Sequence, residues 1–213
     1  MKTIIQTLDK NLSKTNDFNT FIQIGANCGD DEFTQLCKKY KPKQIILIEP
    51  HIRYNESLKQ CYSGLNYVIE NVVITTNPNI NKATLYFPDS EQTRAQHSTL
   101  VPLNDWLGHC YPCSQIPAST FSNILNKYNI IDIDLLMVDT EGMDYSIINS
   151  IDLEKTNIHN IVYESWKFPR ESCYDKNHQN LFGTNGLNFI NNKLTTLGYT
   201  IINDSEDYYA TKE

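Results

Sequence analysis

Short apolar runs that alternate with helical patterns constrain the fold of this 213-residue chain more than any other feature. Runs of this kind, each bounded by turn residues, lie at residues 21–24, 44–49, 67–74, 134–138 and 160–163. Segments with apolar residues at helical spacing lie between them, at residues 31–40, 54–62, 119–128 and 144–151. A parallel sheet covered on both faces by helices requires such a pattern, because its strands are buried on both sides. The sequence therefore predicts an α/β fold with a mostly parallel sheet.

Both ends of the chain fit the same sheet. Near the start, the spacing of apolar residues predicts an amphipathic helix that covers the sheet within residues 1–18, at positions Ile4, Ile5, Leu8 and Leu12. Near the end, a predicted helix at 187–197 precedes strands at 199–202 and 208–211. Few residues join these strands, so we expect an antiparallel hairpin at the sheet edge. The length suits one core, and residues 1–213 are predicted to form a single domain.

Residues 75–117 interrupt this regular alternation. Residues 83–87 fit a strand, but the polar stretch that follows is punctuated by prolines and has no clear period. Such a segment is typical of an active-site loop or of a surface insertion. It contains the closest pair of cysteines, Cys110 and Cys113, and no second pair completes a zinc site. We therefore expect both cysteines to be reduced loop residues.

Charge and hydropathy exclude some partners. The formal net charge of -7 at pH 7 argues against nucleic acid, whose binding depends on clustered lysine and arginine. The basic run formed by Lys38, Lys39, Lys41 and Lys43 suits a solvated helix end and loop. No segment approaches the ~20 apolar residues of a membrane helix, and the first residues lack the apolar stretch of a signal peptide. We therefore expect no membrane partner and a cytoplasmic location.

The loop after the first apolar run is the strongest functional feature. Its sequence is Ile24-Gly25-Ala26-Asn27-Cys28-Gly29, and a predicted helix follows. Glycines at a strand end let the backbone approach a ligand, and open α/β sheets bind ligands at this edge. The G-x-G-x-x-G motif of dinucleotide enzymes has a glycine where this chain has Asn27. We therefore expect a nucleoside ligand without a pyrophosphate.

An acid at the end of the second predicted strand supports an adenosine ligand. Glu49, in Ile48-Glu49-Pro50, is placed to accept hydrogen bonds from both hydroxyls of a ribose. S-adenosylmethionine has this ribose and no pyrophosphate, so it is the predicted cofactor. A charged residue that simply ends a strand is the alternative interpretation of Glu49.

Further carboxylates follow neighbouring strands. Asp139 and Glu141 come directly after the apolar residues 135–138, and Glu164 follows residues 160–163. Such acids could hold the amino group of the ligand, orient an acceptor hydroxyl, accept its proton or bind a divalent ion. No metal is assigned, although these three acids would be its ligands. Glu141 could instead cap the helix that follows.

Two loops add candidates outside the strand ends. His97 is a further candidate base, and an ordinary loop histidine is the alternative. The aromatic-rich connection after Glu164 lies at the predicted ligand-binding edge, where loops often hold substrates, and it contains Trp166, Lys167 and Arg170. A loop folded back for packing would have the same composition.

Together these motifs resemble the FkbM-type S-adenosylmethionine-dependent methyltransferase family, over roughly residues 21–164. The resemblance implies a Rossmann-like class I methyltransferase fold with a seven-stranded sheet and S-adenosylmethionine as donor. It also implies O-methylation of a sugar, glycan or small metabolite. Donor-binding positions would be Gly25, Ala26, Asn27, Cys28, Gly29, Glu49, Pro50, Asn71, Val72 and Asp139. Asp139 and Glu141 would lie at the reaction centre, and Ser98 on the acceptor side.

We therefore predict methyl transfer by direct displacement, with a carboxylate as the base for a hydroxylated acceptor. Two other classes of protein stay open. A non-catalytic domain that binds S-adenosylmethionine or a protein partner would keep the glycine loop and Glu49. A nicotinamide-dependent oxidoreductase would need the pyrophosphate-binding loop that this chain lacks. The sequence assigns no oligomeric state.

Overall fold

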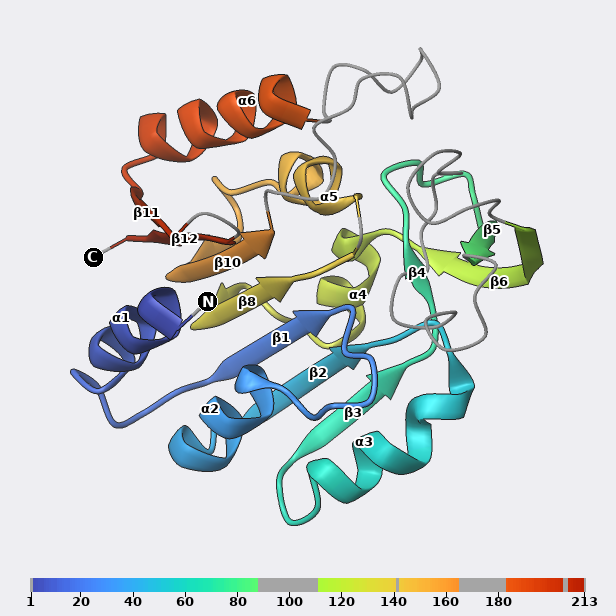
Figure 1. Ribbon diagram of the computed structural model, residues 1–213, viewed down its shortest axis with the longest axis horizontal. Helices are drawn as coiled ribbons and strands as arrows, with labels where there is room; N and C mark the ends of the chain where they lie inside the picture. The colour runs from blue at the N-terminus through green and yellow to red at the C-terminus, as the bar shows by residue number, and fades with distance from the viewer. Residues whose placement is uncertain (1, 88–110, 141, 165–182, 205–206, 213) are drawn as a thin grey trace.

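A seven-stranded sheet forms the centre of the computed structural model, which describes residues 2–87, 111–140, 142–164, 183–204 and 207–212 (Figure 1). The strand order is β11-β12-β10-β8-β1-β2-β3. The strands are β1 (Thr20–Ile24), β2 (Gln44–Ile48), β3 (Tyr67–Glu70), β8 (Leu135–Val138), β10 (Asn160–Glu164), β11 (Thr200–Asn203) and β12 (Asp207–Thr211). The five strands from β3 to β10 run parallel, and β12 is antiparallel to both of its neighbours. The predicted parallel sheet with a C-terminal antiparallel hairpin is confirmed.

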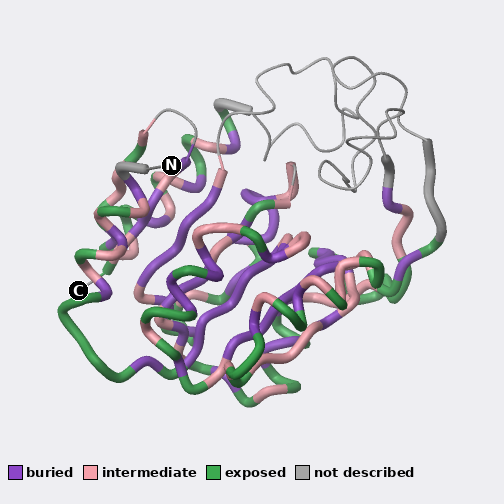
Figure 2. The backbone as a smooth tube through the Cα atoms, turned by 60° about the horizontal axis from the view of Figure 1, so that its bottom comes forward, coloured by how far each residue is buried: buried purple, intermediate pink, exposed green. Residues whose placement is uncertain are grey.

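Helices cover both faces of this sheet, as predicted. Side chains along β1 and β2 point alternately to the two faces of the sheet. Phe21 and Ile45 therefore pack in the core layer on one face, and Ile22 and Ile46 pack in the layer on the other. On the first face lie α1 (Lys2–Leu12), α2 (Glu32–Tyr40) and α3 (Asn55–Cys61), which follows the 3₁₀ turn η1 (Ile52–Tyr54). On the second lie α4 (Phe121–Lys127), α5 (Asp144–Ser150) and α6 (Gly183–Thr196). Figure 2 shows largely buried strands between helices whose outer turns are exposed.

The N-terminal cover is the amphipathic helix α1, which ends at Leu12. Its apolar positions Ile4, Leu8 and Leu12 are buried against the sheet, whereas Ile5 is only partly buried. The lysines of the basic run are exposed at the end of α2 and in the loop after it, as expected. None of the helices in the described ranges is long and apolar enough to cross a membrane.

The predicted strand at residues 67–74 is divided between two sheets. β3 ends at Glu70 because β2 has already ended, and Pro50 has no N–H to continue the ladder. β4 (Val73–Ile74) instead pairs with the far end of β6 (Tyr111–Ser119), and β6 also pairs antiparallel with β5 (Lys82–Phe87). The strand expected at 83–87 is therefore confirmed. β6 was not predicted, and Cys113 lies in this strand instead of the loop that was expected for it. The prolines of β6 resemble loop residues, yet most of its length has a neighbour on one side only, where proline is tolerated.

Candidate functional site

The glycine loop between β1 and α2 lies against the ends of two neighbouring strands. Its backbone is left-handed at Gly25, Asn27 and Gly29, where φ is +90°, +46° and +77°. The Gly25 N–H donates to the Ile48 carbonyl at the end of β2, over 2.9 Å. A Cβ atom on Gly25 would lie 1.8 Å from the carbonyl oxygen of Asp139, the residue after β8. Glycine is therefore required for the loop to lie this close to β8.

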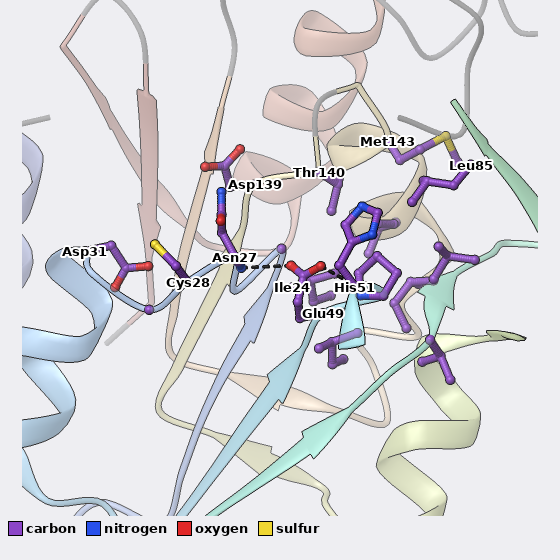
Figure 3. Close-up of a pocket in the computed structure, with 18 of the residues that line it drawn as sticks. Ile24, Asn27, Cys28, Asp31, Glu49, His51, Leu85, Asp139, Thr140 and Met143 are labelled. Carbon is purple, nitrogen blue, oxygen red and sulfur yellow. Dashed lines mark hydrogen bonds between the residues drawn. The ribbon is translucent and has the colours of Figure 1, made fainter. Parts of the chain in front are cut away.

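Glu49 follows β2, and its carboxylate joins the glycine loop to the next turn. Oε2 accepts the Asn27 N–H over 2.8 Å, and Oε1 accepts the His51 N–H over 2.8 Å (Figure 3). Glu49 is only 4% exposed, and this burial raises the pKa of its carboxyl group to about 6. Each oxygen of the ionised group still has a lone pair to offer. The carboxylate is therefore fixed in position and able to accept hydrogen bonds from a ligand.

Asn71, predicted in the donor-binding set, lies behind Glu49 instead of lining the cavity. Its Nδ2 donates to the Glu49 carbonyl over 2.8 Å and to Asn55 Oδ1 over 2.9 Å. These bonds tie the end of β2 to the start of α3. The next residue, Val72, does line the cavity. Asn71 thus supports the backbone of Glu49 from outside the cavity, whereas Val72 forms part of the cavity wall.

A turn after β8 carries Asp139 and Thr140 to the edge of the cavity. The Asp139 N–H donates to the Ile24 carbonyl over 2.9 Å, which extends the pairing of β8 with β1. The Thr140 hydroxyl donates to Asp144 Oδ2 over 2.7 Å, and the Thr140 N–H reaches the same oxygen over 3.3 Å. Asp144 begins α5 and is buried, which raises its pKa to about 6. A buried carboxylate therefore holds the turn that contains Asp139.

A cavity of about 250 Å³ lies between the glycine loop, Glu49 and this turn. It is slightly smaller than the ~300 to 1,000 Å³ of most small-molecule sites. Its apolar wall consists of Ile24, Ile48, Val72, Val73, Ile74, Leu85, Met143 and Ile147. Its polar side contains the carboxylates of Asp30, Asp31, Glu49 and Asp139. The described lining residues include no lysine or arginine. Such a lining suits a ligand with an apolar part and a positive charge.

The predicted site residues fall into three groups. The cavity is lined by Gly25, Asn27, Cys28, Gly29, Glu49, Pro50, Val72 and Asp139. Ala26 is fully buried and packs in the core, and Glu164 ends β10, with its N–H 3.5 Å from Asp144 Oδ1. Outside the described residues lie His97, Ser98, Glu141, Trp166, Lys167 and Arg170, as does Cys110, which was expected to be a loop cysteine. The roles of all these residues stay predictions, as does the metal alternative, which includes Glu141.

Several lining residues were missed from the sequence. His51 comes two residues after Glu49, and its position next to a strand-end motif was an available signal. Burial lowers the pKa of His51 to about 4, so its ring is neutral at pH 7. Asp31 is the N-cap of α2 and accepts the Thr34 N–H over 2.9 Å, a role that its place before a helix could have indicated. Leu85 and Met143 had no local signal, because tertiary folding brings them to the cavity.

A second group of acids lies at the opposite, amino edge of the sheet. In the described part of the chain, Asp132, Asp134 and His159 bring potential metal ligands within 4.8 Å of one another. Hydrogen bonds account for these side chains. Asp134 Oδ2 accepts the N–H groups of Asn19 and Thr20 over 2.6 and 2.8 Å, and His159 Nε2 lies 3.1 Å from Asp132 Oδ1. This group supports the start of the strands, far from the cavity.

Solved methyltransferase structures align with this chain at low sequence identity. A precorrin-6y C5,15-methyltransferase from Geobacter metallireducens GS-15 is 11% identical, with a TM-score of 0.49 over 99% of this chain and 88% of that chain. Methyltransferase FkbM from Methylobacillus flagellatus KT is 13% identical, with a TM-score of 0.49 over 92% of this chain and 44% of that chain. The methyltransferase domain of bacterial CtHen1-CN is 14% identical, with a TM-score of 0.45 and coverages of 97% and 96%.

The family is identified by sequence. No curated protein matches the chain significantly. Residues 23–201, however, match the model of the methyltransferase FkbM domain, which therefore extends from the end of β1 into β11. The strand order, with its parallel strands and edge hairpin, is the Rossmann-like class I methyltransferase fold that the resemblance implied. The chain belongs to the FkbM methyltransferase family.

Proposed function

We propose that this chain transfers a methyl group from S-adenosylmethionine to a hydroxyl group of a sugar, glycan or small metabolite. Membership of the family supports methyl transfer and this donor. The observation that carries the assignment of the cavity is the buried Glu49 carboxylate, which is held by two backbone N–H groups and faces an acidic, partly apolar space. The hydroxyl acceptor is our extension of that assignment.

The residues of the cavity fit the donor in three respects. Glu49 can accept both ribose hydroxyls with the lone pairs that Asn27 and His51 leave available. The Asn27 Oδ1 atom is buried and has no hydrogen-bond donor within the described ranges, so a ligand N–H group would satisfy it. The four lining carboxylates favour a ligand that carries a sulfonium and an ammonium group. The apolar wall offers a surface for a purine ring.

Methyl transfer to a hydroxyl group requires few chemical steps from the protein itself. When bound, the donor supplies a methyl group activated by a positively charged sulfur. The chain must align an acceptor oxygen, exclude water and remove the hydroxyl proton. Asp139 is on the cavity wall, and Glu141 follows it by two residues, so we assign the base to this turn. Glu164, at the end of the neighbouring strand β10, is the next candidate.

The test begins with a panel of sugars and hydroxylated metabolites, screened for formation of S-adenosylhomocysteine. With an active acceptor, Asp139→Asn and Glu141→Gln should lower the rate by ~10² to 10⁴ because a general base is lost. Both variants should melt near the wild type, since they keep the shape of the side chains. Full turnover by both variants would reject a base in this turn. Binding of the donor without turnover of any acceptor would favour the non-catalytic alternative.

A further inference from the structure

Asp144 is a buried carboxylate whose position the proposed reaction does not explain. It is 4% exposed, and it is the first residue of α5. Its Oδ2 atom accepts the Thr140 hydroxyl over 2.7 Å and the Thr140 N–H over 3.3 Å. Its Oδ1 atom lies 3.5 Å from the Glu164 N–H. One side chain therefore contacts the turn after β8 and the end of β10.

Helix capping does not account for these contacts. The N-cap of α5 is Met143, which makes no capping bond through its side chain. The oxygens of Asp144 instead accept hydrogen bonds from a residue before the helix and from a neighbouring strand. Burial of a carboxylate costs several kcal/mol unless its partners compensate, and this burial raises the pKa of Asp144 to about 6. A costly group that joins two strand ends is a candidate for a functional role.

The turn that Asp144 holds also forms part of the cavity. Thr140 lines the cavity directly, and its neighbour Asp139 does so on the other side of the same peptide bond. The Asp139 carbonyl lies against Gly25, where no Cβ atom would fit. A shift of this turn would therefore change the space between the glycine loop and β8.

We propose that Asp144 is a positioning residue, whose carboxylate fixes the ends of β8 and β10 so that Asp139 and Thr140 face the donor. This inference rests on the proposed function, because it assumes that the cavity binds S-adenosylmethionine. It adds a residue that does not touch the donor and acts through Thr140. The contact between the Thr140 hydroxyl and Asp144 Oδ2 is the bond through which the effect passes.

The experiment measures affinity for S-adenosylhomocysteine by calorimetry and thermal stability, so it requires no acceptor. Thr140→Val removes the hydroxyl donor and Asp144→Asn removes the charge of its acceptor, each with little change of shape, and each should weaken binding by about tenfold. The loss of affinity in the double variant should be smaller than the sum of the two single losses, because both substitutions act on the same bond. Thr140→Ser retains the hydroxyl and should bind with wild-type affinity. The loss of affinity in Thr140→Val is then due to the missing hydroxyl and not to a general loss of stability.

Asp134→Asn is the matched control, since Asp134 precedes the same strand β8 and accepts two backbone N–H groups at the other edge. It should lower the melting temperature and leave affinity unchanged. Wild-type affinity in both Asp144→Asn and Thr140→Val would overturn the inference. If Asp144→Asn does not fold, Thr140→Val and Thr140→Ser decide the question. A wild-type protein that does not bind S-adenosylhomocysteine would overturn the proposed function and this inference with it.

Discussion

Carboxylates at the two edges of the central sheet have contrasting surroundings. At the amino edge, the side chains of Asp132 and His159 are 37% and 41% exposed and bond to each other. At the carboxyl edge, Glu49 and Asp144 are each 4% exposed, and both accept N–H groups from turns that line the cavity. Glu49 and Asp144 are thus removed from water, whereas Asp132 and its partner His159 are partly exposed.

This contrast distinguishes carboxylates that support the fold from carboxylates that belong to the proposed ligand site. Asp134 shows that a partly exposed carboxylate is sufficient to satisfy backbone donors at the start of β1. Burial of Glu49 and Asp144 adds a desolvation cost, which is visible in pKa values raised to about 6. The proposed ligand site would account for that cost at the carboxyl edge.

The largest expected effect is that of Gly25→Ala at the carboxyl edge, compared with Gly64→Ala at the amino edge. Gly25→Ala and Gly64→Ala both force alanine into a left-handed conformation, at φ of +90° and +80°, which costs about 1 to 2 kcal/mol. Gly25→Ala also places Cβ 1.8 Å from the Asp139 carbonyl, and relieving this overlap adds about 1 to 3 kcal/mol. A Cβ on Gly64, which precedes β3, meets no described atom within 4 Å. Urea unfolding and calorimetry measure both effects.

We expect Gly25→Ala to lose binding of S-adenosylhomocysteine as well as stability, because the glycine loop must move away from β8. Gly64→Ala should retain wild-type affinity. Equal losses of affinity in the two variants would contradict the division between the edges.

An intermediate effect is expected from Glu49. Glu49→Ala removes a charge-assisted acceptor for the ribose hydroxyls, so affinity for S-adenosylhomocysteine should fall by about 1.5 to 3 kcal/mol. Asp134→Asn, at the amino edge, should leave that affinity unchanged. Calorimetry on both variants provides the comparison. Wild-type affinity in Glu49→Ala would show that the adenosine assignment is wrong.

The affinity should also depend on pH in a defined direction. The proposed hydrogen bonds from the ribose hydroxyls require the ionised form of Glu49, and burial raises the pKa of this group to about 6. Protonation therefore competes with the ligand, and affinity should fall, by up to about tenfold per pH unit, as the pH decreases below 6. Glu49→Gln should abolish this part of the pH dependence. Asp144 titrates in the same range, so any slope that remains in Glu49→Gln is attributed to it.

Much of the fold was predictable because the parallel strands are buried on both faces. The apolar run at Gln44–Ile48 carries its strand signal within its own sequence. Two-residue strands such as β7 (Asp132–Ile133) and β9 (Asn157–Ile158) have no such signal, since their pairing depends on where β8 and β10 begin. The division of residues 67–74 likewise depends on where the neighbouring strand β2 ends.

The site was predictable where its chemistry is local in sequence. Gly25 and Glu49 stand directly after apolar strands, so the general rule for open sheets locates them at the ligand-binding edge. Leu85 and Asp144 lack that relation. Leu85 reaches the cavity from a separate small sheet, and Asp144 has the sequence position of an ordinary acid in the first turn of a helix. Their positions depend on contacts between segments that no local pattern encodes.

The smallest expected effect lies at the amino edge, in Asp132→Asn. Asp132 Oδ1 accepts the Asn157 amide over 2.7 Å and lies 3.1 Å from His159 Nε2, all in a partly exposed setting. Such exposed pairs contribute about 0.2 to 1 kcal/mol, so urea unfolding should show a loss within that range. Affinity for S-adenosylhomocysteine should stay within about twofold of wild type, because a change below 0.5 kcal/mol is typical of a surface substitution.

The same titration with added Zn²⁺ tests the alternative that Asp132, Asp134 and His159 are metal ligands. A zinc-dependent stabilisation that Asp132→Asn removes, or a loss of affinity as large as that of Glu49→Ala, would show that the amino edge does more than support the strands.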